Sequence, residues 1–412
     1  MGQAAQAGLA SMEQTPFNRT QLLIVTLCGA TLFMDGFDAQ AMGYVAPALA
    51  PALHIARQAL GPVFSSGLVG IMIGALLFGP VADRVGRRPV LIVCTVLFGV
   101  CSLLTARADS LAWLLVYRLL TGLGLGGAMP NAIALTAEYA PKRFRATAVT
   151  GMFCGFSIGA AAGGFVAAGL ISRYGWQSVF IAGGITPLVV AVLLMALLPE
   201  SIEFRQSRHQ AGVVVKRLFA DGRARMTVLL WIIFFMSLLD LYFLNNWLPT
   251  VIHDTGIAVE RAIILTALFQ VGGTAGALVL GRLIDRYLSP RVLAWTYLGA
   301  GVCVALIGLA GTSAALLACA ISAAGFLVVG GQSAANALAA EYYPTALRST
   351  GVGWALGIGR IGSIAGPVLG GMLVALQPAT SSLFLTASVP VLLAGGAAFL
   401  AGRGGFHEDR SV

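Results

Sequence analysis

Two aspartates three residues apart stand inside a long apolar stretch near the start of the sequence. The segment Met34-Asp35-Gly36-Phe37-Asp38 lies within the otherwise hydrophobic residues 21–49. In a helix that crosses a bilayer, a charge at the centre costs roughly 3 kcal/mol, and side chains three residues apart share one face. Such carboxylates normally face a polar cavity and handle protons, ions or substrate. Asp35 and Asp38 are therefore the candidate proton-coupling residues, titrating as one coupled unit. The alternative is a pair that only bonds neighbouring helices.

Two arginines, Arg118 and Arg360, also fall inside apolar stretches. A guanidinium keeps its proton in a protein, so each must find an anion. Arg118 has three possible roles: it alternates between a carboxylate of the first stretch and a substrate, it forms a permanent structural ion pair, or it extends to the membrane surface. Arg360 has glycines on both sides, and its planar fork suits bidentate contact with a substrate carboxylate. A fixed ion pair with Asp240 is the competing prediction.

A further group of polar and aromatic side chains follows Asp240 in the seventh apolar stretch. Amides and aromatic rings there can bond a hydroxyl group and stack on the ring of a ligand. The alternatives are hydrogen bonds between helices and an aromatic belt at the membrane interface. Besides the two arginines, the predicted substrate-binding residues are Asp240, Asn245 and Asn246, with Phe37, Tyr44 and Gln332 as wall residues.

The elements that must position these residues are predicted from the composition. The chain has 412 residues, of which 58% are hydrophobic and only 10% are charged, with a mean hydropathy of +0.89. Soluble domains carry about 25% charged residues, so the sequence predicts an all-helical integral membrane protein. About 20 apolar residues are needed for each crossing. Twelve segments meet or approach that length: 21–49, 59–81, 88–106, 111–136, 144–171, 177–198, 227–252, 259–281, 290–310, 313–339, 346–375 and 380–402.

The basic residues indicate the orientation of these segments. With the N-terminus inside, the outer loops hold only Arg57, Arg107, Arg173 and Arg261, and the other loop Lys and Arg fall on the inner side. Inner loops of membrane proteins carry an excess of basic residues, so both termini are predicted to be cytoplasmic. This distribution also accounts for the net charge of +9 without a nucleic-acid partner.

The two halves of the sequence repeat each other. Asp38 and Pro47 recur as Asp240 and Pro249, and the motif that begins at Ala137 recurs at Ala340. Because the repeat spans six helices, both halves run in the same direction through the membrane and are related by an axis along its normal. The predicted organisation is a tail (1–20), a six-helix bundle (21–198), a linker (199–226), a second bundle (227–402) and a tail (403–412). Two such bundles rocking about a central site give alternating access.

Three motifs carry a resemblance to a known family. They are Gly79-Pro80-Val81-Ala82-Asp83-Arg84-Val85-Gly86-Arg87-Arg88-Pro89, Arg118-x-x-Thr121-Gly122-x-Gly124-x-Gly126-Gly127 and Asp35-Gly36-Phe37-Asp38. The first two resemble the signatures of the major facilitator superfamily, and the third resembles its aromatic acid:proton symporters, which include carriers of 4-hydroxybenzoate and protocatechuate. The fold expected from the resemblance is the major facilitator fold, usually a single chain in the bacterial inner membrane.

The resemblance also implies an inner gate. Physically, Asp83 at the end of the second segment can pair with Arg145, and an equivalent pair, Glu341 and Arg348, can close the other half. Such ion pairs bias the equilibrium between conformations when they form and break. The alternative is ordinary positive charge on the cytoplasmic side. The candidate gating residues are Asp83, Arg84, Arg87, Arg88, Glu138, Arg145, Asp285, Arg286, Glu341 and Arg348.

Together these features predict proton-coupled uptake of an aromatic carboxylate such as 4-hydroxybenzoate, with no cofactor and no metal. No serine–histidine–acid arrangement or phosphate-binding glycine loop indicates an enzyme or an ATP-driven pump. Three alternatives stay open: antiport of a hydrophobic or cationic compound, symport of another organic acid or metabolite, and a membrane sensor. Antiport predicts activity that survives loss of Arg360, and a sensor predicts binding without accumulation.

Overall fold

The computed structural model describes residues 18–140, 145–200, 218–220, 222–287, 290–376 and 379–403. Most of the predicted linker 199–226 and nearly all of the two predicted tails, 1–20 and 403–412, lie outside these residues. The predicted division into two six-helix halves joined by that linker therefore stays a prediction.

Twelve long helices make up the described chain, as the sequence predicts, and each is long and apolar enough to cross a membrane. A short 3-10 helix, η1 (Arg57–Ala59), precedes the second of them. The long helices are α2 (Arg19–Ala52), α3 (Leu60–Val85), α4 (Arg87–Thr105), α5 (Leu111–Tyr139), α6 (Arg145–Tyr174), α7 (Gln177–Leu197), α8 (Ala224–Asp254), α9 (Val259–Tyr287), α10 (Pro290–Leu309), α11 (Ala314–Tyr342), α12 (Thr345–Ala375) and α13 (Thr380–Gly402).

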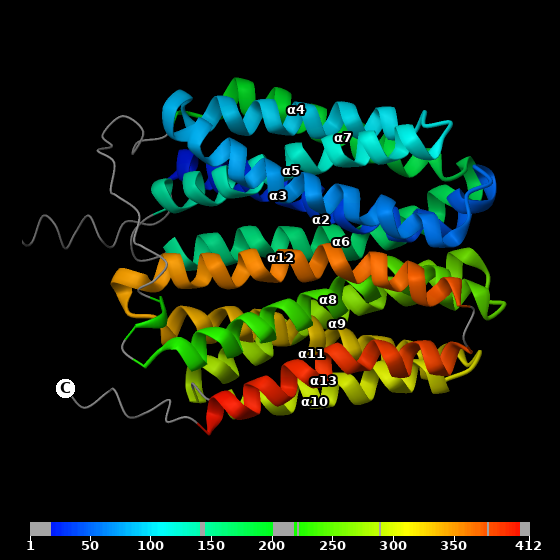
Figure 1. The fold of residues 1–412 in the computed structure, drawn as a ribbon. Coiled ribbons are helices and arrows are strands. Elements are labelled where there is room, and N and C mark those ends of the chain that lie inside the picture. Colours follow the sequence, from blue (N-terminus) through cyan, green and yellow to red (C-terminus); the bar gives the residue numbers. More distant parts are fainter. Residues whose placement is uncertain are drawn as a thin grey trace, which may run out of the picture. The chain divides into compact units, whose positions relative to one another are not determined.

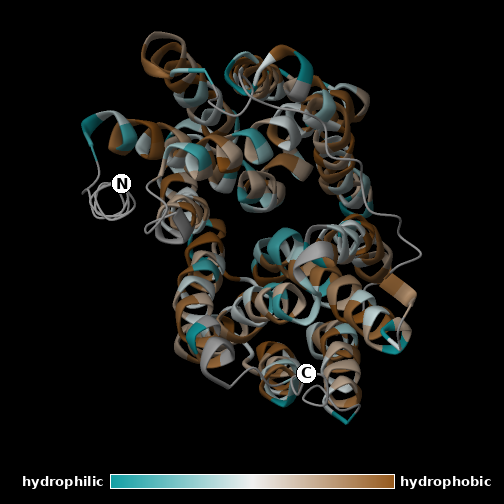
Figure 2. Cartoon of the chain, turned by 90° about the vertical axis from the view of Figure 1, so that its left-hand side faces the viewer, coloured by the Kyte–Doolittle hydropathy of each residue, from teal (hydrophilic) through white to brown (hydrophobic). Residues whose placement is uncertain are grey.

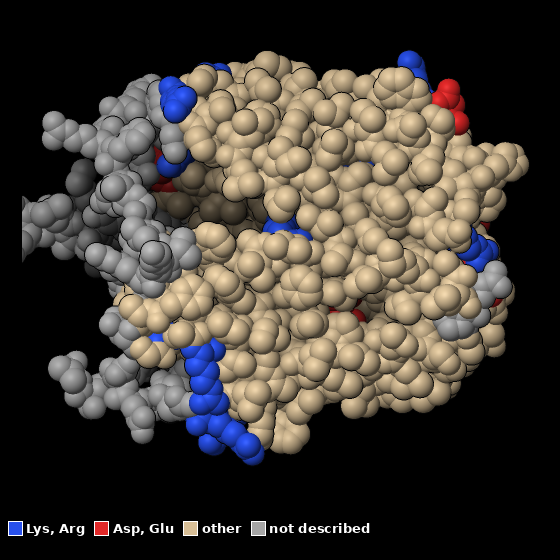
Figure 3. Space-filling view, in the orientation of Figure 1, with Lys and Arg blue, Asp and Glu red and all other residues tan. Residues whose placement is uncertain are grey.

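The distribution of side chains is the one expected of helices in lipid. Large apolar side chains such as Leu76, Trp295 and Leu309 are 65% or more exposed, and hydrophobic residues dominate the ribbon in Figure 2. On the face drawn in Figure 3, most charged side chains stand near the ends of the helices, a few lie between, and other residues cover most of the surface. Backbone groups are bonded within each helix, which is what an environment without water requires. The protein is thus an integral, multi-pass membrane protein.

The described residues form two compact units. The first unit takes its residues from 1–39, 69–160 and 177–209, and in it α4 packs against α5 and α7. The second takes its residues from 40–68, 161–176 and 210–412. Its main helix pairs are α9 with α11, α10 with α13 and α8 with α12, and α10 lies beside both α13 and α11 (Figure 1). The second unit therefore includes one end of α2 and of α3.

Candidate functional site

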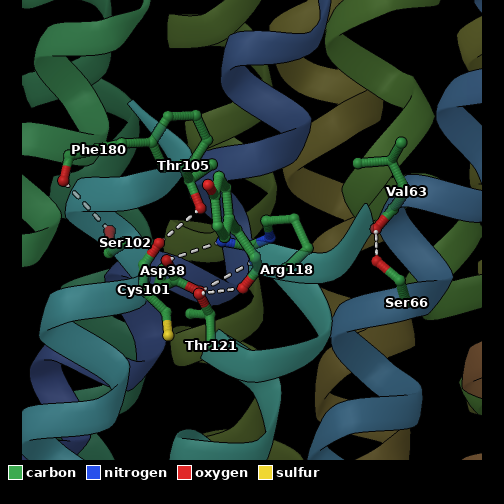
Figure 4. Close-up of polar contacts among 10 residues, drawn as sticks. Asp38, Val63, Ser66, Cys101, Ser102, Thr105, Arg118, Thr121 and Phe180 are labelled. Carbon is green, nitrogen blue, oxygen red and sulfur yellow. Dashed lines mark hydrogen bonds and ion pairs between the residues drawn. The ribbon is translucent and has the colours of Figure 1, made fainter. Parts of the chain in front are cut away.

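The first unit contains a buried ion pair between Asp38 of α2 and Arg118 of α5. Arg118 donates from Nη1 to Oδ1 and from Nη2 to Oδ2 of Asp38, each over 3.0 Å. Asp38 is 1% and Arg118 6% exposed, and the guanidinium carbon of Arg118 lies 5.9 Å from the centre of the Phe180 ring (Figure 4). Two parallel hydrogen bonds of this kind are the strongest form of carboxylate–guanidinium contact. The structure thus pairs Arg118 with a carboxylate of the first segment, a contact that belongs to two of its three predicted roles: alternation with a substrate and a permanent ion pair.

Asp35 lies one turn before Asp38 on the same helix and is 6% exposed. Gly36, the first of the two residues between them, sits against the backbone of α6, where an added Cβ would overlap the carbonyl group of Phe156. Glycine is the residue type that allows two helices to approach this closely in a membrane. Phe37 packs on the other side, with its ring beside Gly183 of α7. Both predicted proton-coupling residues are therefore held in a tightly packed part of α2.

Near the predicted cytoplasmic surface of the first unit, Arg87 of α4 forms an ion pair with Glu138 of α5. The Glu138 side chain is only 3% exposed. The adjacent Arg88 donates its backbone N–H to Oε1 of Glu200 over 3.1 Å and its Nη2 to the carbonyl oxygen of Met195 over 2.7 Å. The pairing of Arg87 with Glu138 was not predicted, because the two residues are far apart in the sequence and only helix packing makes them neighbours.

Most of the other predicted gating residues stay untested. Arg84, Glu341 and Arg348 are exposed near helix ends. The side chains of Asp83, Arg145, Asp285 and Arg286 lie outside what the structure describes, so the predicted pair between Asp83 and Arg145 stays a prediction. The same holds for a role of any of these residues in gating.

In the second unit, Arg360 lies near the middle of α12 and is partly buried. Its Nη1 donates to the hydroxyl oxygen of Tyr242 in α8 over 3.3 Å. Asp240, two residues before Tyr242, is fully buried, and neither of its carboxylate oxygens has a hydrogen-bond partner among the described residues. The predicted alternative of a fixed ion pair between Arg360 and Asp240 is therefore not what this structure contains.

The remaining predicted substrate residues have partners inside the protein. Asn245 accepts from Gln270 Nε2 over 2.9 Å, and Asn246 donates to the carbonyl oxygen of Tyr242 over 2.7 Å. Gln332 accepts from the Ser237 hydroxyl over 2.6 Å. Tyr44, a predicted wall residue, is fully buried, and its ring lies beside the backbone of a glycine in α6. The contacts of Asn245 and Gln332 agree with the alternative of interhelical hydrogen bonding, whereas that of Asn246 lies within α8. Direct contact with a substrate stays a prediction for all four residues.

Sequence reasoning missed a polar group at the predicted periplasmic end of the second unit. Arg57 of η1 forms an ion pair with Asp254, the last residue of α8. A cavity of about 370 Å³ lies beside this pair and is also lined by His54, Thr250 and His253. The only sequence signal was that Arg57 is one of few basic residues on that side, which does not identify Asp254 as its partner.

The end of α2 packs closely on α8 in the same region. A Cβ added at Gly43 would lie 2.5 Å from the carbonyl oxygen of Asn245, so the backbones of the two helices are in direct contact there. Nearby, the Ser65 hydroxyl of α3 donates to the carbonyl oxygen of Ile364 in α12 over 2.7 Å. The first two long helices are thus joined to α8 and α12 at the predicted periplasmic end.

Comparisons with known proteins agree with this architecture. The family model described as Major Facilitator Superfamily matches residues 28–228 and 230–408. The chain is 40% identical to a gallate transporter of Pseudomonas putida, over 93% of this chain and 92% of that protein. It is 41% identical to the 4-hydroxybenzoate transporter PcaK of the same species, over 93% of each.

The fold is also similar to that of solved transporters. A bacterial homolog of the human lysosomal transporter Spinster, in an inward-facing and unoccupied conformation, superposes with a TM-score of 0.77 at 19% identity, over 94% of this chain and 98% of that one. The twelve helices, the repeated motifs and the family match agree with one another. The chain belongs to the Major Facilitator Superfamily and is a transporter rather than an enzyme.

Proposed function

We propose that this transporter carries an aromatic carboxylate, of the 4-hydroxybenzoate or gallate type, into the cell together with a proton. It acts as a single chain in the bacterial inner membrane, with both termini cytoplasmic. The names of the relatives at 40% and 41% identity support the substrate class. The distribution of basic residues along the sequence supports the orientation.

The observation that most strongly supports an anionic substrate is the state of Arg360. Its described hydrogen bond is to a neutral hydroxyl group, that of Tyr242, and no described acidic side chain forms an ion pair with it. A cation in the middle of a membrane helix needs an anion, and the planar guanidinium suits a carboxylate. We assign Arg360 as the anchor of the substrate carboxylate and Tyr242 as a neighbour able to bond a ring hydroxyl.

Arg118 has a different role in this proposal because Asp38 already neutralises it. A proton on Asp38 removes the negative charge that accepts both hydrogen bonds. Arg118 is then left as a buried cation without its partner, a state that costs several kcal/mol. The arrangement of α2 and α5 that keeps the pair together is no longer favoured, so protonation shifts the conformational equilibrium. Asp35, one turn away, is the second carboxylate through which the proton passes.

Proton-driven uptake into liposomes that contain the purified protein tests the substrate class. We expect labelled 4-hydroxybenzoate to accumulate when the outside is more acidic than the inside. Unlabelled gallate should compete, whereas 4-hydroxybenzyl alcohol, which lacks the carboxylate but keeps the ring hydroxyl, should not. If the alcohol competes as well as the acid, the assigned role of Arg360 is wrong. If no benzoate-type acid accumulates under the gradient, the substrate class is wrong.

A further inference from the structure

Asp240 is a buried carboxylate that the proposed transport site does not use. It lies near the middle of α8, has no exposed surface, and both of its oxygens are without hydrogen-bond partners in the described chain. An ionised carboxylate in such a place is strongly disfavoured unless a cation or several donors compensate for the lost water. The question is therefore which neighbours Asp240 has.

Three helices place polar side chains around Asp240. Ser237, one turn earlier on α8, donates to Gln332 of α11 over 2.6 Å. Tyr297 of α10 is fully buried, and its hydroxyl has no hydrogen-bond partner among the described residues. The residue before Gln332 is a glycine, Gly331, and an added Cβ there would lie 2.8 Å from the Tyr297 ring. The neighbours form a small polar cluster made of neutral groups.

No cation of the described helices neutralises this cluster. Arg360 bonds Tyr242, and residues 240 and 242 point in nearly opposite directions because each helical residue turns by about 100°. Other than Arg360, the charged residues of the helices that surround α8 stand near helix ends. They are Glu260, Arg261, Arg282, Asp285 and Arg286 of α9, Arg291 of α10, Glu341 of α11 and Arg348 of α12, and α13 has none.

We propose that Asp240 binds a proton, at a site that it forms with Ser237, Tyr297 and Gln332 and that is separate from the Asp38–Arg118 pair. With the proton bound, the carboxyl group is neutral and becomes a donor to a neighbouring oxygen. Asp38 can be ionised and still belong to a neutral pair, whereas Asp240 is neutral only when protonated. Both units then contain a carboxylate that binds a proton, and the one in the second unit does not depend on which compound is transported.

Infrared absorption of the purified protein in lipid tests this site without any transport assay. The wild-type protein at neutral pH should show the carbonyl band of a protonated carboxylic acid, and Asp240→Asn should lose it. Asp38→Asn is the matched control, because it removes the equivalent carboxylate of the other half, and it should keep the band. Tyr297→Phe should keep the band but shift its frequency, since it removes the neighbouring hydroxyl.

Two results would overturn the proposal: spectra of Asp240→Asn that match the wild type, or a band that disappears when NaCl is added at constant pH, which would assign the site to sodium. If Asp240→Asn does not fold, Tyr297→Phe decides the matter, and an unshifted band in that variant counts against the site. Because the spectra do not depend on uptake, failure here leaves the proposed transport function untouched, and failure of uptake leaves this site untouched.

Discussion

Asp38 in the first half and Asp240 in the second occupy equivalent positions of the sequence repeat, and both are buried. Asp38 accepts two hydrogen bonds of 3.0 Å from Arg118, whereas Asp240 has no described partner. When α5 is aligned with α11 through the repeated motif, the residue that corresponds to Arg118 is Ile321. Both halves contain the carboxylate, but only the first contains the arginine that neutralises it.

This difference gives the halves different chemical capacities. In the first half Arg118 neutralises Asp38, so in the proposed function a proton on Asp38 breaks an ion pair and changes helix packing. In the second half Arg360 bonds the Tyr242 hydroxyl, whereas Asp240 has no hydrogen-bond partner among the described residues. In the proposed function Arg360 is then available to a substrate anion, and Asp240 to a proton. Each of the following experiments perturbs one side of this comparison.

The largest effect is expected from Arg118→Ala. The substitution leaves Asp38 buried without its partner, and removing one member of a buried ion pair costs about 3–5 kcal/mol. Thermal unfolding in detergent should show a large loss of stability, partly recovered in the double variant with Asp38→Asn. Asp240→Asn, which leaves no charge behind, is the matched control. Equal losses in Arg118→Ala and Asp240→Asn would remove the distinction between the halves.

Arg360→Ala should come next and should act on transport. A hydrogen bond to a charged group contributes about 1.5–3 kcal/mol, so the substrate concentration at half-maximal uptake should rise about 10- to 100-fold. Arg360→Lys keeps the charge without the planar fork and should lie in between. Arg261→Ala, an exposed arginine at the start of α9, is the control. Uptake by Arg360→Ala with wild-type kinetics would favour antiport or another anchor.

A smaller effect is expected from Ser237→Ala. It removes the buried 2.6 Å hydrogen bond to Gln332, which is worth about 0.5–1.5 kcal/mol. Ser66→Ala in the same unit removes a hydrogen bond of 2.8 Å within one helix, and serves as the control. Thermal unfolding should separate the two variants. If Ser237→Ala is no less stable than Ser66→Ala, the polar cluster around Asp240 is not held by that bond.

The smallest effect is expected at the predicted periplasmic end. Arg57 and Asp254 are 53% and 26% exposed, and exposed ion pairs contribute only about 0.2–1 kcal/mol. Arg57→Ala should therefore raise the labelling rate of a cysteine placed at Ala50, which lines the adjacent cavity, by no more than about fivefold. High salt should have a similar effect on the protein with Arg57 intact. A labelling rate unaffected by both would show that this ion pair does not restrict access to the cavity.

The sequence predicts the elements far better than the long-range partners. The predicted segment 380–402 matches α13, and the predicted start at 111 matches α5, because apolar runs bounded by polar residues depend only on local composition. The pair of Arg57 with Asp254 joins residues 197 positions apart. Which polar groups meet depends on how the helices pack. Neither the Arg57–Asp254 pair nor the lack of a partner for Asp240 was therefore predictable from the sequence.

The Asp38–Arg118 pair was partly predictable, because both residues interrupt apolar helices and a buried cation needs an anion. For Arg360 the sequence left two possibilities open, contact with a substrate carboxylate and a fixed ion pair with Asp240. That choice depends on helix rotation, since Tyr242 rather than Asp240 is the residue of α8 bonded to Arg360. A rotation of α8 by about half a turn would be needed to bring Asp240 rather than Tyr242 to face α12.

The central claim is that a proton moves inward with the aromatic acid. It is tested most directly by liposomes that contain the purified protein and an internal pH-sensitive dye, with no proton gradient at the start. Addition of 4-hydroxybenzoate outside should acidify the interior in step with substrate entry, and benzoate-free buffer should not. Alkalinisation of the interior would indicate exchange of substrate for protons, and substrate entry without any pH change would show that transport is not coupled to protons.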